Sequence, residues 1–169
     1  MDEGKGKRKS SNILIAGIGN IYRRDDGIGI LVARAIKDRI NTKSGISVDI
    51  VEMNDPSLLI DILQSYDKAI IIDAVMGNSM DRIGTIHTLS YRDIIDNSGD
   101  EIVTSTHTID LRELVMLIGM IYNDDKDLIL IGIEGHDFGM GEGLSPELKY
   151  RIDGIVSAVI DKVNEVIYD

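Results

Sequence analysis

The sequence predicts a three-layer α/β/α fold, in which a β-sheet is covered by helices on both of its faces. Short apolar runs rich in β-branched residues alternate along the chain with segments of helical periodicity, which is typical of α/β proteins. The first run, Asn12–Ala16, lacks the alternation of a half-exposed strand, which indicates a strand buried on both faces. Aromatic residues are few, so we expect a core of Ile, Leu and Val.

The opening unit of this fold is a strand, a tight loop and a helix. A loop rich in glycine and acid, Gly17–Gly29, follows the first strand, and a pattern of helical spacing extends from Ile30 to Ile40. Glycine allows the backbone to turn sharply and to approach other groups closely. Asp25 and Asp26 stand near the helix N-terminus, where the helix dipole favours negative charge, so capping is one interpretation of this pair.

The remaining elements follow from the same patterns. Asp55 before Pro56, and Ser145 before Pro146, predict two helix starts, because a capping side chain followed by proline suits a first helical turn. Further strands are expected over Ile46–Glu52, Lys68–Ala74, Ile83–Leu89 (at an edge) and Leu128–Ile133, with loops over Val75–Asp81 and Glu134–Gly143, an exposed connection over 96–106 and a helix cap near Thr108. The expected buried stripes are Leu58, Leu59, Ile62 and Leu63; Leu111, Leu114, Val115 and Ile118; and Leu148, Ile152, Ile155, Val156, Val159, Ile160, Val163 and Ile167.

Composition limits the classes of function. The chain has 169 residues, which fits one domain, expected over 12–169 after a disordered tail at 1–11. A net charge of −11 argues against a nucleic-acid surface, which needs a basic face. No apolar run is long enough to span a bilayer, no secretory signal is evident, and no cysteine is present for disulfides, thiolate catalysis or cysteine-ligated metals. We therefore expect a cytoplasmic domain that binds neither nucleic acid nor membrane.

Polar side chains at the carboxyl ends of the strands are the candidate functional residues, because ligands of open α/β sheets bind there. Asn20, Asp25 and Asp26 follow the first strand, and Asp73 ends the apolar run of the third. His107 precedes a predicted helix, and Glu134 ends the last strand with His136 and Asp137 close behind. Of these, Asp26, Asp73 and His107 are the candidates for a shared site. Two carboxylates and an imidazole from separate elements suit zinc, nickel, manganese or iron, with positions left open for solvent or substrate. Taken singly, each residue is equally explained by a cap, a turn or a surface position; their shared placement favours one site.

The sequence lacks the key residues of the common nucleotide-binding loops and of the serine-hydrolase site. A dinucleotide-binding loop needs glycine where the chain has Tyr22, and a phosphate-binding loop needs Gly-Lys-Ser or Gly-Lys-Thr. No Gly-x-Ser-x-Gly elbow for a serine hydrolase is present. The sequence therefore favours a site built on carboxylates.

Other polar residues have more than one interpretation. His87 lies in an alternating strand and is expected to be exposed and structural. Glu134 ends the last strand, and His136 follows it, with both an inward and a solvated position open. Arg23 and Arg24 could hold a carboxylate or the main chain of a substrate, or pair with the many acids of this chain.

Several motifs, taken together, match one family. They are Gly17-Ile-Gly-Asn20 with Asp25-Asp26-Gly27-Ile-Gly29, then Ile72-Asp73-Ala74, Thr106-His107, the strand Leu130–Ile133 and the helix start at Ser145-Pro146. With them the chain, from about Asn12 to its end, resembles the hydrogenase maturation proteases. These endopeptidases trim the C-terminus of a nickel-iron hydrogenase large subunit. The resemblance implies a twisted, mostly parallel sheet of five strands with helices on both faces.

The resemblance also implies a site. The nickel-recognising positions of the family fall on Asp26, Asp73 and His107, the same residues that the strand ends single out. It implies an aspartyl-type endopeptidase whose partner is the large-subunit precursor, with nickel carried by that precursor and no other cofactor. Cleavage is then expected close to the precursor's C-terminal cysteine motif. Asp26 stands where part of the family has glutamate.

The resulting hypothesis is metal-assisted peptide hydrolysis. Asp26, Asp73 and His107 would bind the ion, which would polarise the scissile carbonyl or activate a water, or one carboxylate would serve as general base. Three other functions remain open. A non-catalytic nickel-binding chaperone of hydrogenase assembly would use the same residues, an ordinary ligand-binding module would need the acids only as caps, and a self-processing protease of similar fold would carry carboxylates in its site.

Overall fold

The computed structural model describes residues 11–96, 111–122 and 127–168, and these ranges form one five-stranded sheet. All neighbouring strands are parallel except β4, which runs antiparallel to β5 at one edge. The predicted mostly parallel sheet is therefore confirmed, as is the edge position of the fourth strand. The strands are β1 (Ser11–Ile18), β2 (Ile46–Met53), β3 (Lys68–Met76), β4 (Ile86–Ser90) and β5 (Asp127–Gly135), in the spatial order β2-β1-β3-β5-β4.

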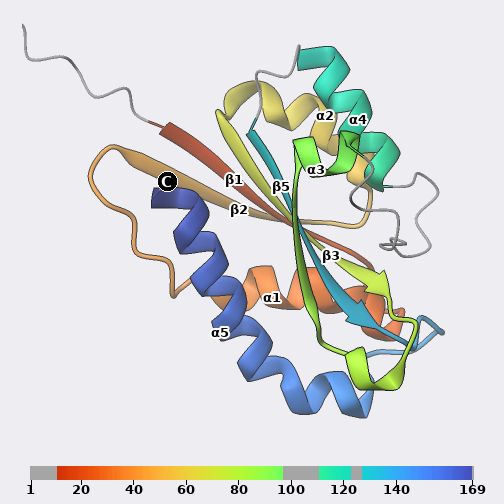
Figure 1. The fold of residues 1–169 in the computed structure, drawn as a ribbon. Coiled ribbons are helices and arrows are strands. Elements are labelled where there is room, and N and C mark those ends of the chain that lie inside the picture. The colour runs from red at the N-terminus through yellow and green to blue at the C-terminus, as the bar shows by residue number, and fades with distance from the viewer. Residues whose placement is uncertain (1–10, 97–110, 123–126, 169) are drawn as a thin grey trace, which may run out of the picture.

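Helices cover both faces of the sheet, as Figure 1 shows. Among the described residues, α1 (Ile28–Ile36) and α5 (Pro146–Tyr168) lie on one face, and α2 (Leu59–Ile62), α3 (Tyr91–Ile95) and α4 (Leu111–Tyr122) lie on the other. Successive strand residues point to opposite faces, so the buried Ile72 packs in the layer of α1 and α5 while Ile71 packs in the layer of α2 to α4. Ile, Leu and Val dominate both layers, as the sequence predicts.

Side-chain caps start the helices where the sequence predicts them. The Asp55 carboxylate accepts hydrogen bonds from the Ser57 hydroxyl at 2.6 Å and from its N–H at 3.0 Å, which holds the pKa of Asp55 below its ordinary value. The Ser145 hydroxyl accepts from the N–H of Leu148 at 3.4 Å. α3 is not among the predicted helices, although Ser90 opens it with a capping box, because five residues are too few to reveal helical periodicity.

Two helical segments differ from expectation. α1 ends at Ile36 rather than near Ile40, and a turn follows it. The chain after Asp55 forms 3-10 turns on either side of the short α2. A 3-10 helix turns every 3.0 residues rather than 3.6, which moves side chains off an α-helical stripe. Leu59 is accordingly buried as expected, whereas Leu58 is half exposed.

The strands β3 and β5 extend past their predicted ends. Val75 pairs with Glu134, and Met76 with Gly135, so these four residues are strand rather than loop. Their pairing continues where the apolar sequence stops, because main-chain hydrogen bonds do not depend on side-chain hydrophobicity. The predicted tail up to residue 10, the connection over 97–106 and the cap at Thr108 lie outside the described residues. Within the described ranges, no helix is long and apolar enough to cross a membrane.

The strand order reverses between β1 and β3, because β2 lies on one side of β1 and the later strands lie on the other. The helix after β1, α1, covers one face of the sheet, whereas α3 and α4, which follow β4 in the chain, cover the other face. A reversal of this kind opens a crevice at the carboxyl ends of the strands, where α/β proteins bind ligands. Asp26 follows β1 and Asp73 lies near the end of β3, so both flank this switch point.

α1 begins directly against the carboxyl ends of β1 and β3. A Cβ atom at Gly29 would lie 2.3 Å from the carbonyl oxygen of Ile18 and 2.4 Å from that of Ile72. Both obstacles are main-chain atoms of central strands, which cannot move without disturbing the sheet. Because Gly29 has no side chain, the start of α1 can pack directly against these carbonyls. This packing places Asp26, just before α1, at the switch point.

Gly29→Ala is expected to lower the free energy of unfolding by about 2–3 kcal/mol or more, because the added methyl group overlaps two strand carbonyls. Gly154→Ala is the matched control, since a Cβ there meets nothing within 4 Å on α5. This control is expected to stabilise the protein by about 0.5–1 kcal/mol through helix propensity. Urea unfolding of both variants measures the difference; effects of the same sign would contradict the close approach at Gly29.

Candidate functional site

Asp26 lies in the 3-10 turn Arg24–Gly27 between β1 and α1, and it is only 2% exposed. Neither this turn nor α1 carries a side-chain cap, so the capping interpretation of the acid pair does not hold. No described residue forms a hydrogen bond with the Oδ1 atom of Asp26. A buried carboxylate oxygen without a donor is unfavourable, which makes Asp26 a candidate ligand for a cation.

Asp73 is the second carboxylate at this end of the sheet. It is fully buried in β3, and its Oδ1 atom accepts a hydrogen bond from the N–H of Ala74 at 2.8 Å. The turn that carries Asp26 contacts β3, and Gly29 touches Ile72, the residue before Asp73. The fold thus brings two buried carboxylates from separate elements to the switch point.

The third predicted site residue, His107, lies outside the described residues. Its role therefore stays a prediction from the sequence. Among the residues that the structure does describe, no group of three His, Cys, Asp or Glu side chains has the arrangement of a metal site. The described part of the candidate site consists of the two carboxylates.

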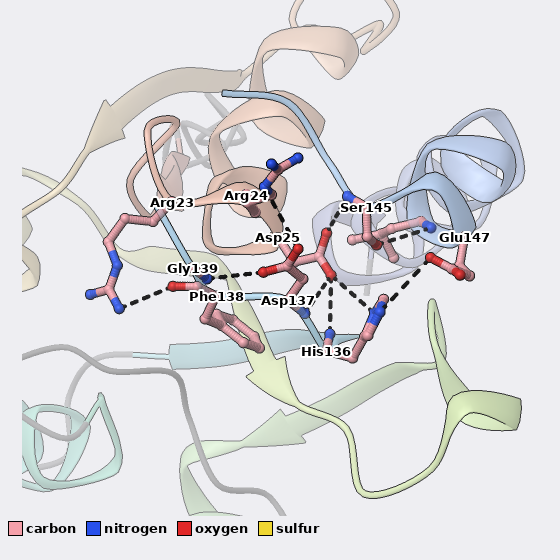
Figure 2. A network of polar contacts seen from close by, with 10 residues as sticks. Arg23, Arg24, Asp25, His136, Asp137, Phe138, Gly139, Ser145 and Glu147 are labelled. Atoms are coloured by element: carbon pink, nitrogen blue, oxygen red, sulfur yellow. Dashed lines mark hydrogen bonds and ion pairs between the residues drawn. The ribbon is translucent and has the colours of Figure 1, made fainter. Parts of the chain in front are cut away.

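Asp25 is fully buried and joins two loops, as Figure 2 shows. Its Oδ1 atom accepts from the N–H of Ser145 at 2.7 Å, and its Oδ2 atom accepts from the N–H groups of His136 and Asp137, both at 3.0 Å. Its own N–H donates to the carbonyl of Asp137 at 2.9 Å. This carboxylate fixes the segment after β5 against the loop after β1. Of the two neighbouring acids, Asp25 is structural and Asp26 is the candidate site residue.

His136 sits between two carboxylates in the same network. Its Nδ1 atom lies 3.4 Å from Oδ2 of Asp25, and its Nε2 atom lies 3.8 Å from Oε2 of Glu147 in α5. Its side chain is 30% exposed, which lies between the inward and the solvated position that the sequence leaves open. It supports the segment after β5 and belongs to the Asp25 network.

A second polar cluster lies at the end of β5. Glu134 is 4% exposed, and its Oε1 atom lies 2.6 Å from Nε2 of His87 and 2.8 Å from Nη2 of Arg82. The expectation that His87 is exposed is therefore wrong. Gly132 of β5 pairs with Asp73 of the neighbouring β3 and with His87 of β4 on its other edge. Residues that are paired across strands point to the same face, so the side chains of Asp73 and His87 lie on one face of the sheet. Sequence reasoning missed this cluster because strand register is not visible in the sequence.

Comparison with known proteins agrees with this architecture. A family model described as hydrogenase maturation protease matches residues 30–162. The chain belongs to the hydrogenase maturation protease family. It is thus a peptidase of hydrogenase maturation, as the sequence motifs predict.

Relatives of this maturation protease match it along most of its length. The hydrogenase expression/formation protein HupD of Thiocapsa roseopersicina is 24% identical over 156 residues, which cover 91% of this chain and 68% of the relative. The nickel-iron hydrogenase maturation protease HybD of Thermococcus kodakarensis is 23% identical, with a TM-score of 0.67 over 90% of this chain and 98% of that one. HycI, from the same organism, is 25% identical, with a TM-score of 0.65 over 89% and 91% of the two chains.

Asp25→Asn is expected to lower the free energy of unfolding of the protease by about 2–3 kcal/mol. The amide NH₂ group would face at least one buried main-chain N–H, which then lacks an acceptor. Asp153→Asn, on the exposed side of α5, is the matched control and should change stability by no more than about 0.5 kcal/mol. Urea unfolding tests this, and equal stability of the two variants would show that Asp25 does not hold the loops together.

Proposed function

We propose that this protease removes a C-terminal peptide from a nickel-loaded precursor of a nickel-iron hydrogenase large subunit in the cytoplasm. Family membership supports a maturation peptidase. The observation that carries the proposal is the pair of buried carboxylates, Asp26 and Asp73, at the switch point of the sheet. Asp26 keeps an oxygen there without a hydrogen-bond donor among the described residues, as a ligand for a cation requires.

In this proposal the nickel ion is part of the substrate. Asp26, Asp73 and His107 would bind the ion while the precursor still holds it. Carboxylate oxygen and imidazole nitrogen are suitable ligands for a divalent transition metal, and the buried oxygen of Asp26 would gain a favourable partner. Three ligands from the protease leave coordination positions for the precursor. The protease would therefore select a precursor that has already received its metal.

Hydrolysis of a peptide bond needs a polarised carbonyl and an activated water. The divalent ion carried by the substrate assists as a Lewis acid. One of the two carboxylates accepts the proton of the attacking water as general base. That proton then passes to the nitrogen of the departing amine, so the precursor gains a new carboxylate end and the C-terminal peptide is released.

Intact-mass analysis tests this proposal directly. The protease is incubated with a hydrogenase large-subunit precursor from the same cell, with and without nickel. We expect the loss of a short C-terminal peptide only from the nickel-loaded precursor. A loaded precursor that binds the protein and keeps its mass would overturn peptidase action on it and favour a non-catalytic nickel-binding chaperone.

Asp26→Asn and Asp73→Asn are each expected to slow cleavage by about 100-fold or more, because an amide is neither an anionic ligand nor a general base. Both substitutions nearly conserve side-chain volume. Asp153→Asn, which removes an exposed carboxylate from α5, should cleave at the wild-type rate. The rates are measured on nickel-loaded precursor after urea unfolding has confirmed that each variant is folded. Wild-type rates for both site variants would contradict the assignment and leave the acids a structural role.

A further inference from the structure

A cavity of about 170 Å³ lies beside the start of α1, outside the carboxylate pair. Ile21 and Leu31 give it apolar walls, and Gly27, the residue after Asp26, forms part of its lining. Charged side chains of Arg24, Arg34 and Glu142 complete this surface, which we call the Arg24 cavity. It adjoins the candidate site and has no part in the chemistry described above.

Arg24 holds an unfavourable backbone conformation beside this cavity. Its φ of 48° makes it the one residue other than glycine with a positive φ in the described part of the chain. Side chains other than glycine are disfavoured in this region because Cβ crowds the following carbonyl. Glycine would adopt the same backbone conformation without strain. Strained positions of this kind cluster at functional sites, which makes the Arg24 side chain a candidate for a functional role.

The contacts of Arg24 with the other described residues do not account for that strain. Its Nε atom lies 3.6 Å from Oδ2 of Asp137, and the two side chains are 41% and 43% exposed. An ion pair this long and this exposed contributes little to stability. Arg34, on the same cavity, is different, because it donates two hydrogen bonds to Glu52, at 2.6 and 3.1 Å, which lowers the pKa of Glu52. Arg24 thus keeps most of its five N–H donors available.

Main-chain contacts hold the Arg24 side chain at the cavity. The main-chain N–H of Arg24 donates to the carbonyl of Gly141 at 3.0 Å, and the N–H of Gly141 donates to the carbonyl of Tyr22 at 2.9 Å. A Cβ at Gly141, whose φ is 143°, would lie 3.0 Å from Nε of Arg24, so glycine makes room for the guanidinium. Arg23 turns away and donates to the carbonyl of Phe138 at 3.2 Å (Figure 2). Only Arg24 of this pair is presented to the cavity.

We propose that the Arg24 cavity is a specificity subsite for the precursor, taking one bulky apolar side chain while Arg24 donates to a main-chain carbonyl of the same segment. This inference rests on the proposed function. A cavity of about 150 Å³ holds a benzene molecule, so this one admits a branched aliphatic side chain or a single ring. Glu142 on its lining disfavours an acidic side chain. Because Gly27 follows Asp26, a segment seated here lies next to Asp26.

Two substitutions test the subsite on nickel-loaded precursor. Arg24→Gly is expected to raise KM about tenfold with kcat changed less than twofold, because a uniform binding contact is lost. Its thermal midpoint should stay unchanged or rise, since glycine relieves the positive φ. Leu31→Trp fills the cavity and should lower kcat/KM by about 10–100-fold. Arg39→Gly and Leu58→Trp, at exposed positions, are the matched controls and should cleave as the wild type does.

A change of specificity separates a subsite from a structural role. Each bulky apolar residue near the cleaved bond of the precursor is exchanged in turn for alanine. One exchange should impair cleavage by the wild type and have little effect on Leu31→Trp, whose cavity is already filled. If the wild type cleaves and both cavity variants retain its KM and its preference, the subsite is overturned while the peptidase stands. If the wild type cleaves no nickel-loaded precursor, the proposed function fails and the subsite fails with it.

Discussion

Asp25 is the residue on which the arrangement of the site depends. Its carboxylate accepts three main-chain N–H groups from the segment after β5, and its own N–H donates back to Asp137. Hydrogen bonds to a charged group are strong, and burial increases their strength. They join the loop after β1 and the segment after β5 into one unit. This unit sets the positions of both neighbours of Asp25, with Asp26 at the carboxylate pair and Arg24 at the cavity.

Structural roles and proposed functional roles alternate over four successive residues of this loop. Arg23 binds the carbonyl of Phe138, and Asp25 is saturated with hydrogen bonds, so both stabilise the fold. Arg24 keeps a strained backbone, and Asp26 keeps a buried oxygen without a donor among the described residues. Each of these two features costs free energy that the fold does not recover locally. Strained backbone and unpaired buried groups are frequent at functional sites of proteins.

The sheet adds a second constraint. Gly29 lets α1 start in contact with the carbonyls of β1 and β3, which places Asp26 over the switch point. On the other side of β3, the register sets Asp73 and His87 across Gly132 from each other, and His87 binds the buried Glu134. Arg82 contacts the same carboxylate oxygen, and a buried charge is tolerated when it has a partner of opposite charge. The carboxylate pair is thus bordered by a compact polar cluster that shares the face of Asp73.

The sequence by itself determined what depends on near neighbours. Helical and strand periods predicted the layers, capping chemistry predicted the starts at Pro56 and Pro146, and strand ends singled out Asp26 and Asp73 as candidates, because these signals lie within a few residues of one another. Tertiary structure alone decided the strand order, the contact of the partly buried His87 with Glu134 and the different surroundings of Asp25 and Asp26. Those outcomes rest on contacts such as that of Asp25 with Ser145, 120 residues along the chain. Such partners meet only after the strands have packed side by side and brought the loops at their carboxyl ends together.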